Sequence, residues 1–184
     1  NRIEETGNKA IPSEEIKSFN VSQPLESNET THYSVYDSFG NAVSTTTTIN
    51  SAFGSGIVVE GAGFLLNNEM DDFSIKAGVP NLYGLIGSEA NQIVPEKRML
   101  SSMTPAIVTK NDSLYMIVGS PGGSTIITTV AQVISNIIDH HMQARQAVEA
   151  PRFHHQWLPD EILYEANEFA KDVLNNIKIK ENKS

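Results

Sequence analysis

The fold class is decided by residues 114–138, which read LYMIVGSPGGSTIITTVAQVISNII. The first five residues are apolar, with β-branched and aromatic side chains that favour a strand. Gly122 and Gly123 follow and predict a turn. From about residue 124 to 141, apolar residues recur at the three- and four-residue steps of an amphipathic helix, namely Ile126, Val130, Val133, Ile134, Ile137 and Ile138. A strand that turns through glycines into a helix predicts an α+β layered domain.

Two hairpins are expected before this helix. Residues 31–37 and 42–50 are rich in β-branched and aromatic side chains and flank a Ser-Phe-Gly-Asn turn. Residues 106–109 precede a Lys-Asn-Asp-Ser turn that leads into the strand at 114–118. The pattern therefore indicates four strands before the main helix.

The remaining segments are less regular. A helix over 142–150 is expected to stop before Pro151, and a last helix is expected from about 159 to 179. Residues 77–88 contain three glycines and a proline and are interpreted as an ordered but mobile loop. Residues 1–29 are polar and rich in turn formers, which is typical of a linker or tail.

Composition excludes several classes of protein. The 184 residues suit one domain and carry a formal net charge of −9 without a basic cluster, which disfavours nucleic-acid binding. No apolar run approaches the roughly 20 residues of a membrane-spanning helix. The opening Asn1–Glu5 lacks the basic start and apolar core of a signal peptide. The absence of cysteine removes disulfides, thiolate nucleophiles and cysteine-rich zinc sites.

Histidines form two adjacent pairs, His140-His141 and His154-His155. Neighbours on a helix point in different directions, whereas two helical zinc ligands are usually four residues apart. The acidic segment 67–72 lacks the spacing of an EF-hand loop. We therefore expect no metal and no cofactor, and interpret the histidines as surface or packing residues.

A threonine pair marks the passage from the polar segment to the first expected strand. Thr30 is either an inert loop residue or a nucleophile released by cleavage of the Glu29–Thr30 bond. A new α-amine titrates near pH 8, so it can accept the proton of its own hydroxyl group. This is the N-terminal threonine nucleophile, which needs no histidine.

Two further segments suit an acyl substrate. Gly122 and Gly123 either form a plain turn or present backbone N–H groups at a helix N-terminus to a carboxylate or an oxyanion. The segment is not a P-loop, because the Lys-Ser/Thr ending is missing. A carboxylate of the 67–72 cluster could hold a substrate ammonium group by charge-assisted hydrogen bonds.

Five ordered motifs resemble those of γ-glutamyltranspeptidases over about residues 8–161. They are Glu26-Ser27-Asn28-Glu29-Thr30-Thr31-His32-Tyr33-Ser34, Leu65-Leu66-Asn67-Asn68-Glu69-Met70-Asp71-Asp72-Phe73, Leu100-Ser101-Ser102-Met103, Gly119-Ser120-Pro121-Gly122-Gly123-Ser124 and Ala150-Pro151-Arg152-Phe153-His154-His155-Gln156-Trp157.

The resemblance implies a fold, a maturation step and a reaction. The family has the four-layer αββα sandwich of N-terminal-nucleophile hydrolases, and its precursor cuts itself into a large and a small subunit. Residues 1–29 would be the end of the large-subunit region, and 30–184 a small-subunit catalytic region that is C-terminally incomplete. The Thr30 hydroxyl would attack the Glu29 carbonyl, and afterwards glutathione or another γ-glutamyl amide. Water, an amino acid or a peptide would then accept the glutamyl group.

The resemblance also implies site residues. Thr48 matches the threonine that hydrogen-bonds the nucleophile, and Gly122 with Gly123 match the oxyanion hole. Tyr83 matches a tyrosine of a lid over the site. The remaining matches bind the two charged groups of the donor: Asn50, Glu69 and Asp72 its α-amino end, and Ser101 and Ser102 its α-carboxylate.

This sequence departs from the family at several points. Glu29 replaces a frequent glutamine, and Met99 and Thr125 replace a common proline and arginine beside the anion-binding motifs. The large-subunit arginine that clamps the α-carboxylate has no counterpart here, and the family's C-terminal strands are missing after about Ile162. Homologues are periplasmic, secreted or surface-held, so the resemblance implies a periplasmic or extracellular address. The alternatives are a cephalosporin-acylase-like amidase and an inactive chain that acts only by association.

Overall fold

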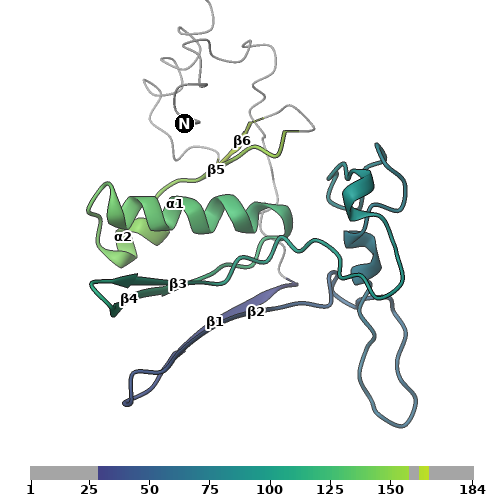
Figure 1. Ribbon diagram of the computed structural model, residues 1–184, viewed down its shortest axis with the longest axis horizontal. Coiled ribbons are helices and arrows are strands. Elements are labelled where there is room, and N and C mark those ends of the chain that lie inside the picture. Colours follow the sequence, from purple (N-terminus) through teal and green to yellow (C-terminus); the bar gives the residue numbers. More distant parts are fainter. Residues whose placement is uncertain (1–28, 158–161, 166–184) are drawn as a thin grey trace, which may run out of the picture.

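The computed structural model describes residues 29–157 and 162–165 (Figure 1). Its elements are β1 (Thr31–Tyr36), β2 (Ala42–Thr47), η2 (Glu69–Asp72), η3 (Glu89–Asn91), β3 (Ala106–Lys110), β4 (Ser113–Val118), η4 (Gly123–Thr125), α1 (Ile126–Ile138), α2 (Ala144–Glu149), β5 (Phe153–His154) and β6 (Leu163–Tyr164). The mixture of helices with antiparallel strands is the α+β class that the sequence predicts.

Both expected hairpins are confirmed. β1 pairs with β2 from Thr31↔Thr47 to Tyr36↔Ala42, and their turn is closed by Asp37 Oδ1, which accepts the N–H groups of Phe39 and Asn41 at 2.9 and 2.8 Å. β3 pairs with β4 around Asn111 and Asp112, whose φ angles of 52° and 60° suit the tight turn of a two-residue hairpin.

The main helix is confirmed but is shorter than expected. A single 3-10 turn, η4, precedes α1, which runs from Ile126 to Ile138 and buries Ile126, Val130 and Val133. The part of the chain that the structure describes contains no helix long and apolar enough to cross a membrane. His140 and His141 follow the helix end and are exposed, so the assumption that this pair lies on a helix was wrong.

The C-terminal elements differ in part from expectation. α2 forms within the expected range, and Ala147 is fully buried. The helix expected over 159–179 can be compared with the structure only at residues 162–165. None of these four residues is helical, so the prediction is wrong there, and the rest of the range lies outside the described residues. Leu163–Tyr164 instead forms strand β6 against β5. Arg152 stabilises this pairing, because its guanidinium and backbone N–H both bind the Glu165 carboxylate, at 2.6 and 3.1 Å.

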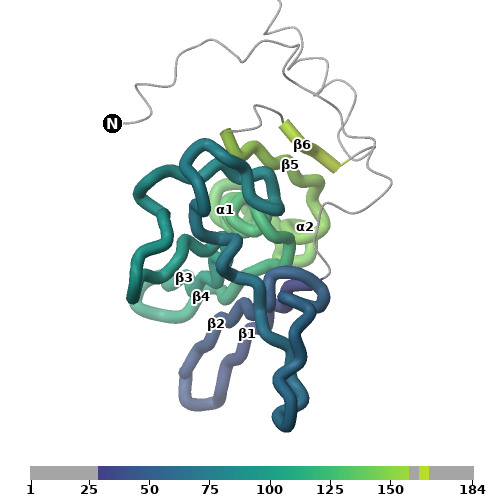
Figure 2. Tube along the Cα trace, turned by 90° about the vertical axis from the view of Figure 1, so that its right-hand side faces the viewer, coloured from purple at the N-terminus to yellow at the C-terminus, as the bar shows by residue number. Residues whose placement is uncertain are grey.

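Figure 1 and Figure 2 show the order of the layers. Helix α1 runs alongside the β3–β4 hairpin, and the β1–β2 hairpin lies beyond it, away from the helix. The irregular segment between β2 and β3 gathers at one end of the hairpins, near the start of α1. The residues that lead into β1, out of β2 and into α1 therefore meet at this end.

The two hairpins join through a close backbone contact. The Gly119 backbone lies directly against the imidazole of His32, and a Cβ at position 119 would overlap that ring. His32 Nδ1 lies 2.8 Å from Thr46 Oγ1, and the Ser44 hydroxyl donates to the Val118 carbonyl at 3.2 Å. Burial lowers the pKa of His32, which favours the neutral form of the ring that packs on Gly119.

Much apolar surface stays open in the described residues. The buried apolar side chains are Phe73, Ile126, Val130, Val133 and Ala147. Tyr33, Val35 and Val43 share one face of the β1–β2 hairpin and are 50%, 50% and 48% exposed. Contiguous apolar surface of this kind is typical of a face that packs against another layer.

A substitution at Gly119 tests the hairpin junction. Gly119→Ala should lower the free energy of unfolding by about 1–3 kcal/mol, because the new methyl group overlaps the His32 ring. The measurement is urea unfolding of the whole protein. His32→Ser should remove most of this penalty in the double variant. Equal penalties in the presence and absence of the imidazole would contradict the contact.

Candidate active site

Thr30 lies at the start of β1, opposite the end of β2. The register Thr31↔Thr47 places Thr30 across from Thr48, and the Thr30 hydroxyl donates to Thr48 Oγ1 at 3.2 Å. Thr30 is only 8% exposed. The hairpin register therefore brings together two hydroxyl groups that are 18 residues apart.

Asn50 links this threonine pair to two other segments. Its backbone N–H donates to Thr48 Oγ1 at 2.9 Å, and its φ of 76° turns the chain away from β2. Its side-chain amide donates to the Asn68 carbonyl at 3.4 Å, next to η2. Its carbonyl accepts the Tyr83 hydroxyl at 2.7 Å. Asn50 is 5% exposed, so these bonds are shielded from water.

Tyr83 packs against the glycine turn before α1. A Cβ at Gly123 would lie 3.0 Å from Tyr83 Cε1, and the φ of Gly123 is +57°. Gly122 has a φ of +135°, and its carbonyl accepts the N–H of Thr125 at 3.0 Å. Both positions therefore favour glycine, at Gly123 because an aromatic ring lies on its backbone.

A small cavity of about 30 Å³ lies where these segments meet. It is lined by Thr30, Thr48, Asn50, Asp72, Tyr83, Leu85, Ser101, Ser102, Met103, Gly123 and Ile126. Most residues expected at the site thus share one cavity. Glu29, Glu69 and Gly122 do not line it, although each is close in sequence to a residue that does. No arginine lines this cavity in the described part of the chain.

Three lining residues were not expected from the sequence. Leu85, Met103 and Ile126 give the cavity an apolar wall. Met103 belongs to the Leu-Ser-Ser-Met motif, and Leu85 to the loop that carries Tyr83. Their positions beside expected site residues could therefore have indicated that they lie near the site. Ile126 was assigned only to the core face of the helix, because helical periodicity does not indicate proximity to a cavity.

The acidic segment supplies two coupled carboxyl groups. Burial raises the pKa of Glu69, and the neighbouring charge of Asp72 raises it further. Burial also raises the pKa of Asp72, helped by Asp71 and opposed by a hydrogen bond with Glu69. Glu69 Oε1 is buried without a hydrogen-bond partner. A cation placed here would stabilise both ionised forms.

Asp71, unlike Glu69 and Asp72, binds the backbone of the loop that carries Tyr83. Its carboxylate accepts the N–H of Leu82 at 2.9 Å, on the loop that carries Tyr83. The acidic segment therefore contains one residue that lines the small cavity, Asp72, its buried neighbour Glu69, and one residue that holds the loop.

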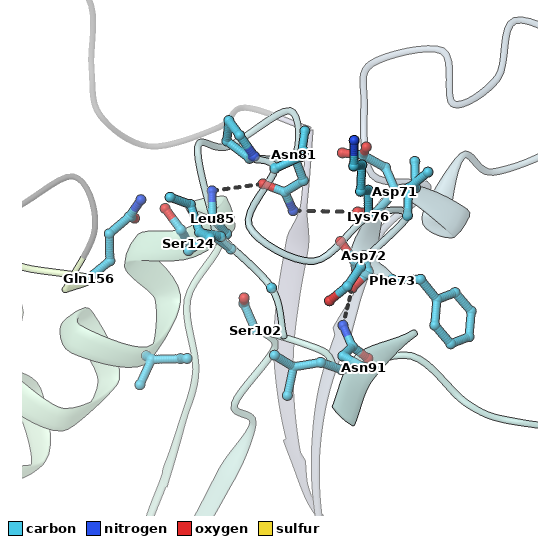
Figure 3. A pocket seen from close by; sticks show the side chains of 18 of the residues that line it. Asp71, Asp72, Phe73, Lys76, Asn81, Leu85, Asn91, Ser102, Ser124 and Gln156 are labelled. Carbon is cyan, nitrogen blue, oxygen red and sulfur yellow. Dashed lines mark hydrogen bonds between the residues drawn. The ribbon is translucent and has the colours of Figure 1, made fainter. Parts of the chain in front are cut away.

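Ser101 and Ser102 reach the cavity from the segment before β3. Ser101 Oγ accepts the Met103 N–H at 3.2 Å, and Ser102 is half-buried. Figure 3 shows Ser102 beside Asp72, where the small cavity adjoins a larger one of about 450 Å³. Asp72, Leu85 and Ser102 line both cavities. Hydroxyl and carboxyl groups thus border one small space. A ligand with both an ammonium and a carboxylate group could bind there, the first to the carboxyl group and the second to the hydroxyl groups.

The histidine pairs lie outside the small cavity, although His154 and His155 line the larger one. His154 is 5% exposed and packs between α1 and the Tyr83 loop, with Nδ1 2.8 Å from Thr128 Oγ1. Across residues 29–157 and 162–165, no group of three or more histidine or acidic residues is placed to hold a metal ion.

Comparison with known proteins identifies the family. The family model described as gamma-glutamyltranspeptidase matches residues 1–184. The chain is 55% identical over 173 residues to the glutathione hydrolase proenzyme of Escherichia coli, covering 94% of this chain and 30% of that protein. The family-model match over the whole chain and the identity to this relative agree. The chain belongs to the γ-glutamyltranspeptidase family.

Solved structures agree with the sequence relationship. The T380A mutant of Helicobacter pylori γ-glutamyltranspeptidase aligns with a TM-score of 0.78 and 62% identity, covering 81% of this chain and 80% of that chain. An acivicin-inhibited γ-glutamyltranspeptidase, whose C-terminus has critical roles in autoprocessing and catalysis, aligns equally well, with a TM-score of 0.78, 62% identity and coverage of 81% and 79%. The chain nevertheless spans only about 30% of the length of the curated Escherichia coli relative.

The buried acidic pair predicts how stability depends on pH. A carboxyl group whose pKa is raised by folding costs stability as pH rises, because the folded state must ionise it in a buried place. Glu69→Gln should leave the melting temperature nearly unchanged below about pH 4, near the unperturbed pKa, and raise it progressively towards pH 7.

Thermal melts of the whole protein across this pH range provide the measurement. Glu89→Gln, on the exposed turn η3, is the matched control and should show no such trend. A Glu69→Gln effect of the same size at pH 4 and pH 7 would contradict the burial argument.

Proposed function

We propose that the whole protein is a γ-glutamyl hydrolase and transferase that uses Thr30 as an N-terminal nucleophile. The observation that carries the proposal is the hydrogen bond between the hydroxyl groups of the buried Thr30 and the half-buried Thr48, in one cavity with Asp72, Ser102 and Gly123. Family membership supports the same chemistry. Glutathione and other γ-glutamyl amides are the proposed donors.

Maturation would begin with the Thr30 hydroxyl. Its oxygen attacks the Glu29 carbonyl carbon, the C–N bond breaks, and the acyl group passes from nitrogen to oxygen as an ester. Water then hydrolyses this ester and leaves Thr30 with a free α-amine. Glu29 takes part through its backbone carbonyl, so its side chain can differ from glutamine. The hydrogen bond to Thr48 would orient the attacking oxygen.

Turnover would use the same oxygen. The α-amine takes the hydroxyl proton as Thr30 attacks the γ-carbonyl, and it returns that proton to the departing amine. Backbone N–H groups of Gly122 and Gly123, at the start of η4, are the proposed donors to the oxyanion. Water resolves the acyl-enzyme in hydrolysis, and an amino acid or peptide amine resolves it in transfer.

The donor head group carries one charge of each sign. Asn50 and the buried pair Glu69 and Asp72 would bind its α-ammonium group, which supplies the cation that these carboxyl groups lack within the described residues. Ser101 and Ser102 would bind its α-carboxylate. The carboxyl pair favours a donor with a free amino group over the substrates of a cephalosporin-acylase-like amidase.

A larger assembly is part of the proposal. Residues 1–29 would end the large-subunit region, and 30–184 would form a small-subunit region that is incomplete at its C-terminus. The open face of Tyr33, Val35 and Val43 supports packing against the other half of an αββα sandwich. An arginine of that large subunit would complete the α-carboxylate site. A periplasmic or extracellular address follows from the family alone.

Replacing the nucleophile tests both steps. Thr30→Ala in the whole protein should leave the chain uncut and abolish hydrolysis of γ-glutamyl-p-nitroanilide, because one oxygen serves both reactions. Mass spectrometry should find a fragment that begins at Thr30 in the wild type alone. The neighbouring substitution Thr31→Ala is the control and should permit cleavage. Turnover by the Thr30→Ala chain would refute the assignment, and a wild-type chain that stays intact would favour an inert associating protein.

Removing the charge of Asp72, one member of the acidic pair, tests donor recognition. Asp72→Asn should leave cleavage at Thr30 largely intact but lower kcat/KM for γ-glutamyl-p-nitroanilide about 10- to 100-fold, because a charge-assisted bond to the ammonium is lost. Glutaryl-p-nitroanilide, which lacks the amino group, should be affected much less. Asp112→Asn, in the exposed β3–β4 turn, is the matched control. Equal losses on both donors would contradict the ammonium role.

A further inference from the structure

A chain of side-chain contacts joins helix α1 to the loop that carries Tyr83. Thr128 Oγ1 lies 2.8 Å from His154 Nδ1, and His154 Nε2 lies 2.9 Å from Gln156 Oε1. The Gln156 side-chain amide in turn donates to the Tyr83 carbonyl at 3.4 Å. These residues come from α1, from β5 and from the segment just after β5.

One tautomer of His154 makes every bond in this chain run from donor to acceptor. With the proton on Nε2, Nε2–H donates to Gln156 Oε1, and Nδ1 accepts the single Thr128 hydroxyl proton in place of the Thr125 carbonyl, which lies 3.0 Å from the same oxygen. The amide group of Gln156 is then fixed with its NH₂ towards the Tyr83 carbonyl. His154 is 5% exposed, so its ring is held in place by packing as well.

The loop itself is held at the opposite side by the acidic segment. Asn81 Oδ1 accepts the N–H groups of Tyr83 and Leu85 at 3.0 and 2.9 Å, which folds the loop tip on itself. Asp71 accepts the N–H of Leu82 at 2.9 Å. Figure 3 shows Asn81 and Leu85 between Gln156 on one side and Asp71 on the other.

The bond from Gln156 to the Tyr83 carbonyl is long, at 3.4 Å, as is the bond from the Asn81 side-chain amide to the Asp71 carbonyl, at 3.5 Å. A bond of this length is weak and breaks readily. The two bonds inside the loop tip, at 3.0 and 2.9 Å, are shorter than the bond from Gln156, so loss of the Gln156 bond is expected to loosen the loop without unfolding its tip.

The position of the Tyr83 loop limits the size of the cavity beside Thr30. The cavity beside Thr30 measures about 30 Å³, which is room for about one water molecule. Tyr83 forms one side of it, because its hydroxyl bonds the Asn50 carbonyl and its ring lies on Gly123. Movement of the Tyr83 loop would therefore widen the space beside Thr30.

We propose that Gln156, oriented by His154 and Thr128, is a positioning residue that sets how readily the Tyr83 loop opens over Thr30. Helix α1 and the turn before it then contact the Tyr83 loop at two points. Gly123, in η4, lies under the Tyr83 ring. Thr128 orients His154, which in turn orients the Gln156 amide towards the Tyr83 carbonyl. The link between loop opening and catalysis rests on the proposed function, whereas the effect on the loop does not.

The test compares hydrogen–deuterium exchange in the whole protein. Gln156→Glu keeps an acceptor for His154 Nε2–H but replaces the donor to the Tyr83 carbonyl with a carboxylate oxygen. Backbone amides of residues 81–87 should exchange about three- to tenfold faster, the effect of one modest hydrogen bond. Exchange in α1 and in the β3–β4 hairpin should be unchanged. Gln92→Glu, at an exposed position, is the matched control.

A double variant tests whether Thr128 acts through Gln156. Thr128→Val alone should accelerate exchange of the same loop, and adding it to Gln156→Glu should give no further acceleration, because both break one chain of contacts. Fully additive effects would overturn the positioning role of Thr128. Unchanged loop exchange in Gln156→Glu, or an equal increase throughout the protein, would overturn the proposal itself.

Kinetics separate this proposal from the proposed function. With γ-glutamyl-p-nitroanilide, Gln156→Glu should raise KM about three- to tenfold and change kcat less than twofold. Loss of the bond to the Tyr83 carbonyl would weaken closure of the loop over the donor, whereas the reacting atoms would be unchanged. A loss confined to kcat would overturn the positioning role. If the wild type has no such activity, the proposed function fails while the exchange result still decides the role of Gln156.

Discussion

The register of the β1–β2 hairpin is the constraint on which the site depends. Because side chains alternate between the two faces of a strand, a shift of one residue would turn Thr48 away from Thr30 and carry Asn50 with it. Asn50 in turn connects the hairpin to the acidic segment and to Tyr83. The contact of Gly119 with His32 then fixes the hairpin against β4, just before the glycine turn.

The electrostatics of the site follow from burial rather than from the number of charges. The chain carries a net charge of −9, yet the pKa shifts at the site are those of the buried Glu69 and the half-buried Asp72, which lie beside each other. Their neighbour Asp71 instead binds a backbone N–H. A buried carboxyl pair without a cation costs stability in the folded chain. A cation bound beside the two carboxyl groups would remove that cost.

Much of this organisation is visible in local sequence patterns. Alternation and turn residues predicted both hairpins, helical spacing predicted α1, and the motif residues identified the family and most residues lining the Thr30 cavity. The last helix was wrong at Leu163–Tyr164, because pairing with β5 and the Arg152–Glu165 ion pair outweigh local preference there. His140 and His141 were placed on a helix that ends before them, since a periodic pattern locates helix ends only to within a few residues.

Sequence alone determined which residue types are present for the proposed chemistry: a threonine before a strand, paired glycines before a helix, and a run of acidic residues. These features are readable because each depends on neighbours within a few positions. Only the tertiary structure decided that Tyr83 lies on Gly123, that Asp72 titrates differently from an exposed carboxylate, and that Gln156 meets the Tyr83 carbonyl. Each of these outcomes depends on residues from segments that are brought together by packing, and no local pattern records such distances.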